Sequence, residues 1–511
     1  MRRALAMAGI LVTACSDPGA TPGDDAGAAD SRALDAPSSP PDGSGVDATS
    51  DASAPVLSLA AFPGAEGAGA NSVGGRGGAV YVVTTLADSG AGSLRACVEA
   101  KGPRTCVFAV GGTLRLKTGL YVTQPFLTVA GQSAPGGGIT LTNADGAVVN
   151  DLLIVVTHDV TWQYTRFRNQ YRTECSNAAT SECGALASFF AGAHDVIADH
   201  NSLSWNQDDG YGIWGGASPG VQDVTLSMSL VAEALDSHST GVIVGGSTSA
   251  LSGQVTDIDM HHNLVMNDGH RNPLFKSKSG RIVANIFYNQ AYYVSQVGGG
   301  GSVDLIGNVY KKGPMNAGFH EIQAFTASGT DALDGSPSLY VAGNVGWNQT
   351  NPSGDPWPMV QRVTGENGTE NGAAPTAWKR TTPLPLRGKA ISLGTDGIVD
   401  TVGASRRLDC DGAWVENRDE VDARNVKQYL TNTGITKRIA KETDVGGLPT
   451  LAAGTACADA DKDGLPDLWE SAHGLSPSDA SDGATKRPNA VGYTNLELFL
   501  SGLFPKNAPL P

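Results

Sequence analysis

An acidic loop near the C-terminus has the spacing of a calcium ligand set. The run DADKDGLPDLWE, residues 459–470, places carboxylates at its first, third, fifth, ninth and twelfth positions and Gly464 at its sixth. Hard carboxylate oxygens at this spacing converge on one cation, and glycine permits the sharp turn between them. We therefore predict a structural calcium site. Its ligands are Asp459, Asp461, Asp463, Asp467, Glu470 and the backbone carbonyl of Leu465.

The residues that flank this loop resemble bacterial calcium repeats of the EF-hand, thrombospondin type-3 or dockerin kind. A second copy of the loop is expected close to the sequence VGYTNLELFL. Arg487, Val491 and Leu498 stand where oxygen donors are needed, so we predict that this copy binds no metal. A solvated acidic loop is the alternative interpretation of the first copy.

The stretch NDGHRNPLFKSKSG, residues 267–280, places two cations beside a proline. Pro273 has no backbone N–H and holds its predecessor extended, so the stretch suits neither a helix interior nor a central strand. Taken alone, Arg271 is expected to pair with Asp268 at the surface or to bind a carboxylate. The 511-residue chain has a net charge of −16 and no basic block, which argues against nucleic acid as a partner. An acidic ligand must therefore be held by local cations such as Arg271 and Lys276.

The N-terminus has the pattern of an export signal. Two arginines precede an apolar run at residues 5–14, which is too short to cross a bilayer. The sequence VTAC ending at Cys15 resembles the lipobox of bacterial lipoproteins, which implies cleavage before Cys15 and acylation of its thiol; an ordinary signal peptide is the alternative. Residues 16–55 contain almost nothing to bury and are expected to form a solvated tether. We predict an exported protein, either a cell-surface or outer-membrane lipoprotein or a secreted one, that contacts membrane only through Cys15.

The remaining cysteines are even in number, which in an exported chain suggests disulfides. No CxxC pair occurs, which argues against a zinc site. Sequence alone does not fix the connectivity. Proximity favours the pairs Cys97–Cys106, Cys175–Cys183 and Cys410–Cys457.

Residues 58–400 are rich in glycine and asparagine and consist of short β-branched runs, many of them followed by Asn or Ser. Irregular coils of alternating apolar and polar residues predict an all-β fold, a right-handed parallel β-helix with an amide ladder at its turns. A β-sandwich is the rival, but the repeated strand–Asn unit favours the solenoid. The runs, taken from Val160, Val196, Val224, Ile258, Ile282, Val303 and Leu339, are separated by 36, 28, 34, 24, 21 and 36 residues. The ladder is expected at Asn263, Asn285, Asn308 and Asn344.

A solenoid needs a cap over its first coil. Residues 93–100 predict a short capping helix that begins after Ser93. We expect a monomer, with residues 350–455 closing the far end. The predicted division is a signal at 1–15, a tether at 16–55, the β-helix at 56–400, a closure or linker at 401–456 and a calcium-loop module at 457–511.

Seven sequence segments, quoted below in chain order, together resemble a known family more specifically than any one of them does. Together they resemble polysaccharide lyase family 1, the pectate lyases, and most of all its pectate lyase C branch. The resemblance spans roughly residues 60–350. It implies a parallel β-helix that binds Ca²⁺ and cleaves polygalacturonate, an acidic plant polysaccharide, by β-elimination. The segments are AFPGAEGAGANSVGGRGG (61–78), YVVTTLADSGAGSLR (81–95), VAGQSAPGGGITL (129–141), YTRFR (164–168), DHNSLSWNQDD (199–209), HSTG (238–241) and RNPLFK (271–276).

The resemblance assigns roles to particular residues. Arg271 matches the arginine implied to take the C5 proton of the sugar. Lys276 stands at the second arginine of the motif and keeps a cation for a uronate carboxylate. Asp208 and Asp209 fall where the family has calcium-binding carboxylates, and Glu182 is a candidate third ligand. The position that is often Asp in the family is nearest to Gly184 here.

Further arginines are candidates for the substrate cleft. Arg166 and Arg168 share a face of their predicted strand and are expected to bind substrate there, with a plain solenoid surface as the alternative. Many family members carry a cleft lysine just before the arginine coil, and residues 238–241 contain none.

The expected chemistry sets a pH dependence. Calcium and Lys276 would neutralise the sugar carboxylate and stabilise the enolate-like intermediate, and Arg271 would act as the base. An unperturbed guanidinium titrates above about 12, so we expect an alkaline optimum. The alternatives are a non-catalytic β-helix that binds polysaccharide, and a lyase for methylated pectin that needs no calcium.

Overall fold

The computed structural model describes residues 59–510 apart from short gaps. The predicted signal with Cys15, the tether at 16–55, the Cys175–Cys183 pair and Glu182 lie outside the described residues. No helix in the described part is long and apolar enough to span a membrane. The gaps are residues 174–183, 217, 237, 316–317, 367 and 488–491.

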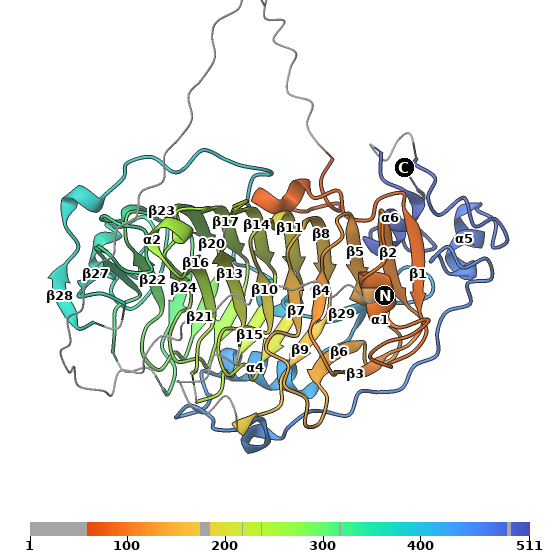
Figure 1. Ribbon diagram of the computed structural model, residues 1–511, viewed down its shortest axis with the longest axis horizontal. Coiled ribbons are helices and arrows are strands. Elements are labelled where there is room, and N and C mark those ends of the chain that lie inside the picture. The colour runs from red at the N-terminus through yellow and green to blue at the C-terminus, as the bar shows by residue number, and fades with distance from the viewer. Residues whose placement is uncertain are drawn as a thin grey trace, which may run out of the picture.

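The chain winds into stacked coils that each cross three sheets in turn (Figure 1). In one coil it passes from β8 (His158–Gln163) to β9 (Arg166–Arg168) and β10 (Ala187–Phe189). It then enters β11 (His194–Asp199), which pairs in parallel with β8. Parallel pairing between successive coils excludes the antiparallel β-sandwich. The fold is the predicted right-handed parallel β-helix.

The three sheets are numbered in the order in which a coil meets them. Sheet 1 contains β1 (Ala79–Val83), β2 (Arg104–Phe108), β5 (Leu127–Ala130), β8, β11, β14 (Val221–Ser227), β17 (Val255–His261), β20 (Ser279–Val283), β23 (Ser302–Ile306) and β26 (Ser338–Ala342). Sheet 2 contains β3 (Gly112–Leu116), β6 (Ile139–Asn143), β9, β12 (Ser202–Ser204), β15 (Leu230–Ala232), β18 (Leu264–Met266), β21 (Ile286–Tyr288) and β24 (Val309–Lys311). Sheet 3 contains β4 (Leu120–Val122), β7 (Leu153–Val155), β10, β13 (Tyr211–Gly215), β16 (Val242–Gly246), β19 (Leu274–Phe275), β22 (Ser295–Gly298), β25 (Ile322–Phe325), β27 (Val360–Val363) and the antiparallel β28 (Glu370–Ala373).

The predicted amide ladder stands at the corner between sheets 1 and 2. The backbone N–H of Asn263 donates to the side chain of Asn285 at 3.0 Å, and Asn285 and Asn308 donate in the same way to Asn308 and Asn344 at 2.9 Å. Just before Asn263, His262 has φ 55°, a left-handed conformation that turns the chain sharply. Each turn leaves buried backbone groups without sheet partners, and the stacked amides satisfy them.

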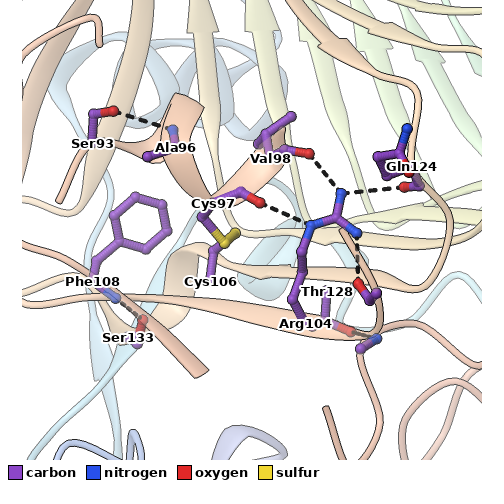
Figure 2. Close-up of a disulfide and its surroundings, with 12 residues drawn as sticks. Ser93, Ala96, Cys97, Val98, Arg104, Cys106, Phe108, Gln124, Thr128 and Ser133 are labelled. Carbon is purple, nitrogen blue, oxygen red and sulfur yellow. Dashed lines mark hydrogen bonds between the residues drawn. A yellow bond between two sulfur atoms is a disulfide. The ribbon is translucent and has the colours of Figure 1, made fainter. Parts of the chain in front are cut away.

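The first coil is capped as predicted, and Figure 2 shows the arrangement. Helix α1 (Leu94–Val98) begins after Ser93, whose hydroxyl accepts the N–H of Ala96 at 3.2 Å. The buried guanidinium of Arg104 donates to the carbonyls of Cys97 and Val98 at 2.8 and 2.6 Å. The Cys97–Cys106 disulfide ties α1 to β2, and this predicted pair is confirmed.

The segment after the last coil does not simply close the far end, as was expected of residues 350–455. Residues 360–380 do close that end, on the left of Figure 1: β27 and β28 extend sheet 3, Trp378 is buried against the core, and Lys379 pairs with Leu339 of β26. The chain then runs back outside the solenoid through α3 (Ile398–Thr401), the hairpin of β29 (Arg406–Leu408) and β30 (Trp414–Glu416), and α4 (Glu420–Thr431). Apolar side chains on the outer face of sheet 2 explain this course, because they need cover. Those of β15, β18 and β21 pack with Ile398, Val402 and Val426.

The C-terminal module packs on the first coils, beside β1 and β2 (Figure 1). Its helices are α5 (Asp467–His473) and α6 (Asn495–Leu500). The predicted Cys410–Cys457 disulfide is present and joins the hairpin of β29 and β30 to the start of the module. The apolar contact comprises Val107, Ala130, Leu408, Leu465, Trp469, Leu496, Phe499 and Leu500. A short helix α2 (Ser249–Ser252) and the 3-10 turns η1 (Ala68–Asn71), η2 (Gly131–Ser133), η4 (Trp357–Met359), η5 (Thr376–Trp378) and η6 (Glu442–Val445) complete the described elements.

Candidate active site

The motif residues gather on the loops that lead from sheet 2 to sheet 3. Asp208 and Asp209 lie between β12 and β13, and Arg271 lies between β18 and β19, two coils further on. The intervening loop is paired to the Arg271 loop by a parallel bridge between Thr240 and His270. Because stacked strands are about 4.8 Å apart, these loops form one continuous edge.

Arg271 is an almost buried cation held by carboxylates from other coils. Its Nη1 lies 3.2 Å from Asp209 Oδ2 and 3.8 Å from Asp208 Oδ1, and its Nη2 lies 3.3 Å from Glu366 Oε1. Asp268, its nearest acidic neighbour in sequence, instead accepts the N–H of Ala234 at 2.8 Å. The expected surface pair with Asp268 is therefore wrong, and Arg271 is bound across coils to the predicted calcium carboxylates.

Lys276 follows β19, and its side chain is fully buried. Its ammonium group binds Asp331, lies 3.3 Å from Glu366 Oε2 and sits 5.4 Å from the centre of the Trp214 ring. Glu366 therefore bridges the two motif cations through its two oxygens. Burial raises the pKa of Glu366, but the charges of Arg271 and Lys276 outweigh it and leave that pKa below its ordinary value.

Sequence reasoning missed Glu366. It lies just beyond β27, in the part of the chain that the seven motif segments do not reach. No local pattern marks a glutamate that folds back over residues some 90 positions earlier.

The two adjacent aspartates form a hard-oxygen site with incompletely balanced charge. Burial and the charge of Asp208 raise the pKa of Asp209 to about 6, despite the nearby Arg271. Burial also acts on Asp208, but His238, whose Nδ1 lies 2.8 Å from Asp208 Oδ1, holds its pKa below the ordinary value. Buried carboxylates that repel each other are suited to a cation with a preference for oxygen ligands.

Asp151 supplies a carboxylate where the predicted ligand is missing. A Cβ built on Gly184 would lie only 2.4 Å from Asp151 Oδ2, so this carboxylate fills the space of a side chain at 184. Ser188 donates a hydrogen bond to Asp151. Burial is the main cause that raises the pKa of Asp151 to about 7, and the charge of Asp208 adds to it. The charge of Asp208 therefore reaches Asp151, although the oxygens of Asp151, Asp208 and Asp209 do not all lie within 4.8 Å of one another in the described structure. The role of Glu182 stays a prediction.

Arg166 and Arg168 do not line a cleft. Both side chains are completely buried between sheet 2 and α4. Arg168 Nη2 lies 2.5 Å from Asp422 and 3.2 Å from Asp419, and Arg166 donates to the carbonyls of Gly137 and Ala404 at 2.8 Å. The prediction that they bind substrate is wrong, because the returning C-terminal segment covers this face of the solenoid. They hold that segment in place.

The predicted calcium loop at the C-terminus brings most of its carboxylates together. Ligand atoms of Asp459, Asp461 and Asp463 lie within 4.8 Å of one another, and so do those of Asp463, Glu470 and Asp482. Asp467 is not in either group, and its Oδ1 accepts the N–H of Ala460 at 2.8 Å. The side chain of Leu465 lies in the apolar contact with the first coils.

A separate hollow lies on sheet 1, away from these loops. It has a volume of about 380 Å³, and its walls include Tyr164, His200 and His262 with residues 61–66 and part of the C-terminal module. Neither Arg271 nor Lys276 lines it. The two motif cations therefore lie outside this hollow, although residues of the motif segments 61–78 and 199–209 line it.

The solenoid and its edge of buried charges define a β-helical protein with paired cations and carboxylates along one line of loops. No family model matches the chain. The probable pectate lyase C of Aspergillus fumigatus is 31% identical over 467 residues, which cover 88% of this chain and 95% of the relative. That of Aspergillus terreus is 30% identical, over 88% and 96%. The chain therefore belongs to the pectate lyase family, whose members are lyases.

Similar solved structures include jun a 1, the major allergen from cedar pollen. It is 16% identical over 66% of this chain and 92% of that chain, with a TM-score of 0.45. A pectate lyase bound to a hexasaccharide is 13% identical over 69% of this chain and 99% of that chain, also with a TM-score of 0.45.

Proposed function

We propose that the protein is a calcium-dependent pectate lyase that cleaves polygalacturonate by β-elimination to unsaturated oligogalacturonates. The observation that carries this proposal is the bridging carboxylate of Glu366, 3.3 Å from both Arg271 and Lys276. Two buried cations that share one carboxylate form a receptor for another carboxylate of similar size, such as that of a uronate. Several pectate lyases among the relatives support the same activity.

The reaction requires these residues to exchange partners. An incoming uronate would displace Glu366, and Lys276 would then hold the sugar carboxylate. Anionic neighbours favour the protonated form of a guanidinium, so Arg271 must leave Asp209 and Glu366 before it can take the C5 proton. The electron pair of the C5–H bond then forms the C4–C5 double bond, the C4–O bond breaks, and the departing sugar oxygen takes a proton from water.

The donor set of the aspartates fits calcium. Asp208, Asp209 and Asp151 offer only carboxylate oxygens, and the raised pKa values of Asp209 and Asp151 mark negative charge that the neighbouring cations leave unbalanced. Calcium, when bound there, would neutralise the sugar carboxylate and so ease removal of the C5 proton. The same ion is proposed for the C-terminal loop, where its role is structural.

The test is the ultraviolet absorbance of the new double bond during incubation with polygalacturonate. We expect turnover with Ca²⁺, loss of turnover with a chelator, and a fall of about 10³-fold for Arg271→Ala, the order of a lost general base. Arg115→Ala is the matched control, because Arg115 is an arginine with a 46% exposed side chain on sheet 2. Circular dichroism must show that both variants are folded.

Other outcomes would overturn the proposal in distinct ways. Undiminished turnover by the Arg271 variant removes Arg271 from the chemistry, as does a pH optimum below neutrality. Binding of the polymer without cleavage at any alkaline pH identifies a binding protein. Cleavage of methylated pectin alone, without calcium, identifies a different lyase.

We also propose export as a monomeric lipoprotein. The basis is the sequence before and at Cys15 together with the polar tether that follows it. In a bacterial host, Cys15→Ser is expected to move the protein from the membrane fraction to the soluble fraction, and sedimentation of that soluble form measures its mass. Membrane retention of the variant would contradict the lipid anchor.

A further inference from the structure

The C-terminal carboxylates form a denser and more buried group than a surface loop requires. The two triads, Asp459 with Asp461 and Asp463 and Asp463 with Glu470 and Asp482, share Asp463. Glu470 is 0% exposed and Asp463 is 4% exposed. Negative groups withdrawn from water at this density need a compensating charge.

Several of these oxygens have no partner within the described residues. They are both oxygens of Asp461, both oxygens of Glu470, Oδ2 of Asp463 and Oδ1 of Asp482. Backbone N–H groups satisfy Asp459, through Lys462 and Gly464, the other oxygen of Asp463, through Leu465, and the other oxygen of Asp482, through Ser476. The unpartnered oxygens therefore face one another, as they do around an ion.

The ligand set differs from the twelve-residue pattern. Asp467 belongs to neither triad and binds Ala460. Asp482 takes a place in the group from outside the loop, and its Oδ2 accepts the N–H of Ser476 at 2.9 Å while its Oδ1 stays unpartnered. Gly483 permits this approach, because a Cβ there would lie 2.2 Å from Asp463 Oδ2.

The position of Asp482 connects the loop to the last helix. The carbonyl of Asp482 accepts a hydrogen bond from the Asn495 side chain at 2.7 Å, and Gly483 accepts the N–H of Leu496 at 3.0 Å. Asn495 and Leu496 begin α6, and Leu496 and Trp469 of α5 pack on the first coils. An ion between Glu470 and Asp482 would therefore fasten α5 to α6 over the end of the solenoid.

We propose a divalent cation site, with calcium as its ion, formed by Asp459, Asp461, Asp463, Glu470 and Asp482, that locks the C-terminal module onto the first coils of the β-helix. Carboxylates without histidine or cysteine favour calcium or magnesium over zinc. Calcium accepts a larger and less regular oxygen shell than magnesium, and a group contributed by two separate segments suits it better. This site is independent of the lyase chemistry at Arg271.

The test uses the full chain stripped of metal and titrated with Ca²⁺ or Mg²⁺, followed by calorimetry and thermal unfolding. We expect Ca²⁺ to raise the melting temperature more than Mg²⁺ does. Asp482→Asn should weaken Ca²⁺ binding at the C-terminal site at least about tenfold. Asp479→Asn is the matched control, because Asp479 is an exposed aspartate three residues away whose side chain accepts hydrogen bonds from Ser481 in its own turn. It should bind Ca²⁺ as the wild type does.

Each outcome is decisive. If the Asp482 variant binds Ca²⁺ like the wild type, the site is confined to the loop and the proposal fails; it also fails if Ca²⁺ does not stabilise the wild type. Should that variant not fold, Gly483→Ala tests the same contact by pressing a methyl group on Asp463, and normal Ca²⁺ binding by it would overturn the site. A protein without lyase activity that still gains stability from Ca²⁺ would refute only the proposed function.

Discussion

Two buried charge clusters in this molecule are built on opposite plans. Around Arg271 and Lys276, each cation touches more than one carboxylate, and Glu366 serves both. Around Glu470, carboxylates meet one another, and Asp463, Asp461 and Asp482 add to the burial that raises the pKa of Glu470 to about 8. We call the first kind of cluster balanced because each of its cations is paired with carboxylates, even though Asp209 retains excess negative charge. The second kind, which has no protein cation among the described residues, is called unbalanced.

The two clusters therefore differ in the ligand that each would bind. A balanced cluster is stable without a ligand, but it must be opened before an anionic substrate can enter. An unbalanced cluster disfavours folding until a cation arrives, because like charges in a low dielectric repel strongly. Neutralising one carboxylate should therefore lower the stability of a balanced cluster. In an unbalanced cluster without its cation, the same change should raise the stability.

The largest effect is expected at the balanced cluster beneath α4. Asp422 lies 2.5 Å from Arg168 and 2.6 Å from the hydroxyl of Ser202. Asp422→Asn would leave a buried arginine without one of its counter-ions and should lower the free energy of unfolding by about 3 kcal/mol. Chemical denaturation measures this loss, and the exposed Glu420→Gln in the same helix turn serves as the control. Equal stability of the two variants would contradict the idea that this pair holds the returning segment.

A moderate effect is expected where Glu366 occupies the proposed substrate position. Glu366→Gln removes the charge that competes with the uronate, so KM for polygalacturonate should fall by about 3- to 10-fold while kcat does not decrease. Steady-state kinetics separate the two constants. Glu370→Gln is the control on the same strand pair, since Glu370 is exposed and binds His320. A rise in KM for the Glu366 variant would show that this glutamate helps to bind substrate.

The smallest effect has the opposite sign. Glu470→Gln relieves repulsion in the unbalanced cluster, so in calcium-free buffer it should raise the free energy of unfolding by about 1 kcal/mol. With Ca²⁺ present, the variant should gain less stability than the wild type because a charged ligand is lost. Asp467→Asn, in the same loop but outside both triads, should change both values less, because Asp467 is the weakest of the charges that raise the pKa of Glu470. If Glu470→Gln destabilises the calcium-free protein, repulsion between the carboxylates does not dominate this cluster and the comparison fails.

Much of the solenoid could be predicted from local pattern, including its approximate register. Val160, Val196, Val224 and Ile258 stack directly, as their positions in similar runs suggested. The alignment then slips by two residues, because Ile282 pairs with Met260 and not with Ile258. Side chains alternate with a period of two along a strand, so a slip of two keeps the same face inward and leaves no trace in the pattern.

The site was predictable only where its residues belong to short motifs. Arg271 and Asp209 were found in that way, and the structure brings them within 3.2 Å of each other. Glu366 and Asp482 were missed because each reaches its cluster by folding back from another segment. Arg168 was wrongly predicted to bind substrate. The segment that buries it begins more than 200 residues later, and the sequence near Arg168 gives no sign of it.

The packing of Leu496 and Phe499 against Val107 has a consequence for the order of assembly. The edge of the solenoid that is translated first is shielded by helices that are translated last. Until α5 and α6 become available, β1 and β2 present apolar side chains and an open strand edge, a condition that invites association between chains. A chain interrupted before residue 465 should therefore have its coils but tend to aggregate through their leading end.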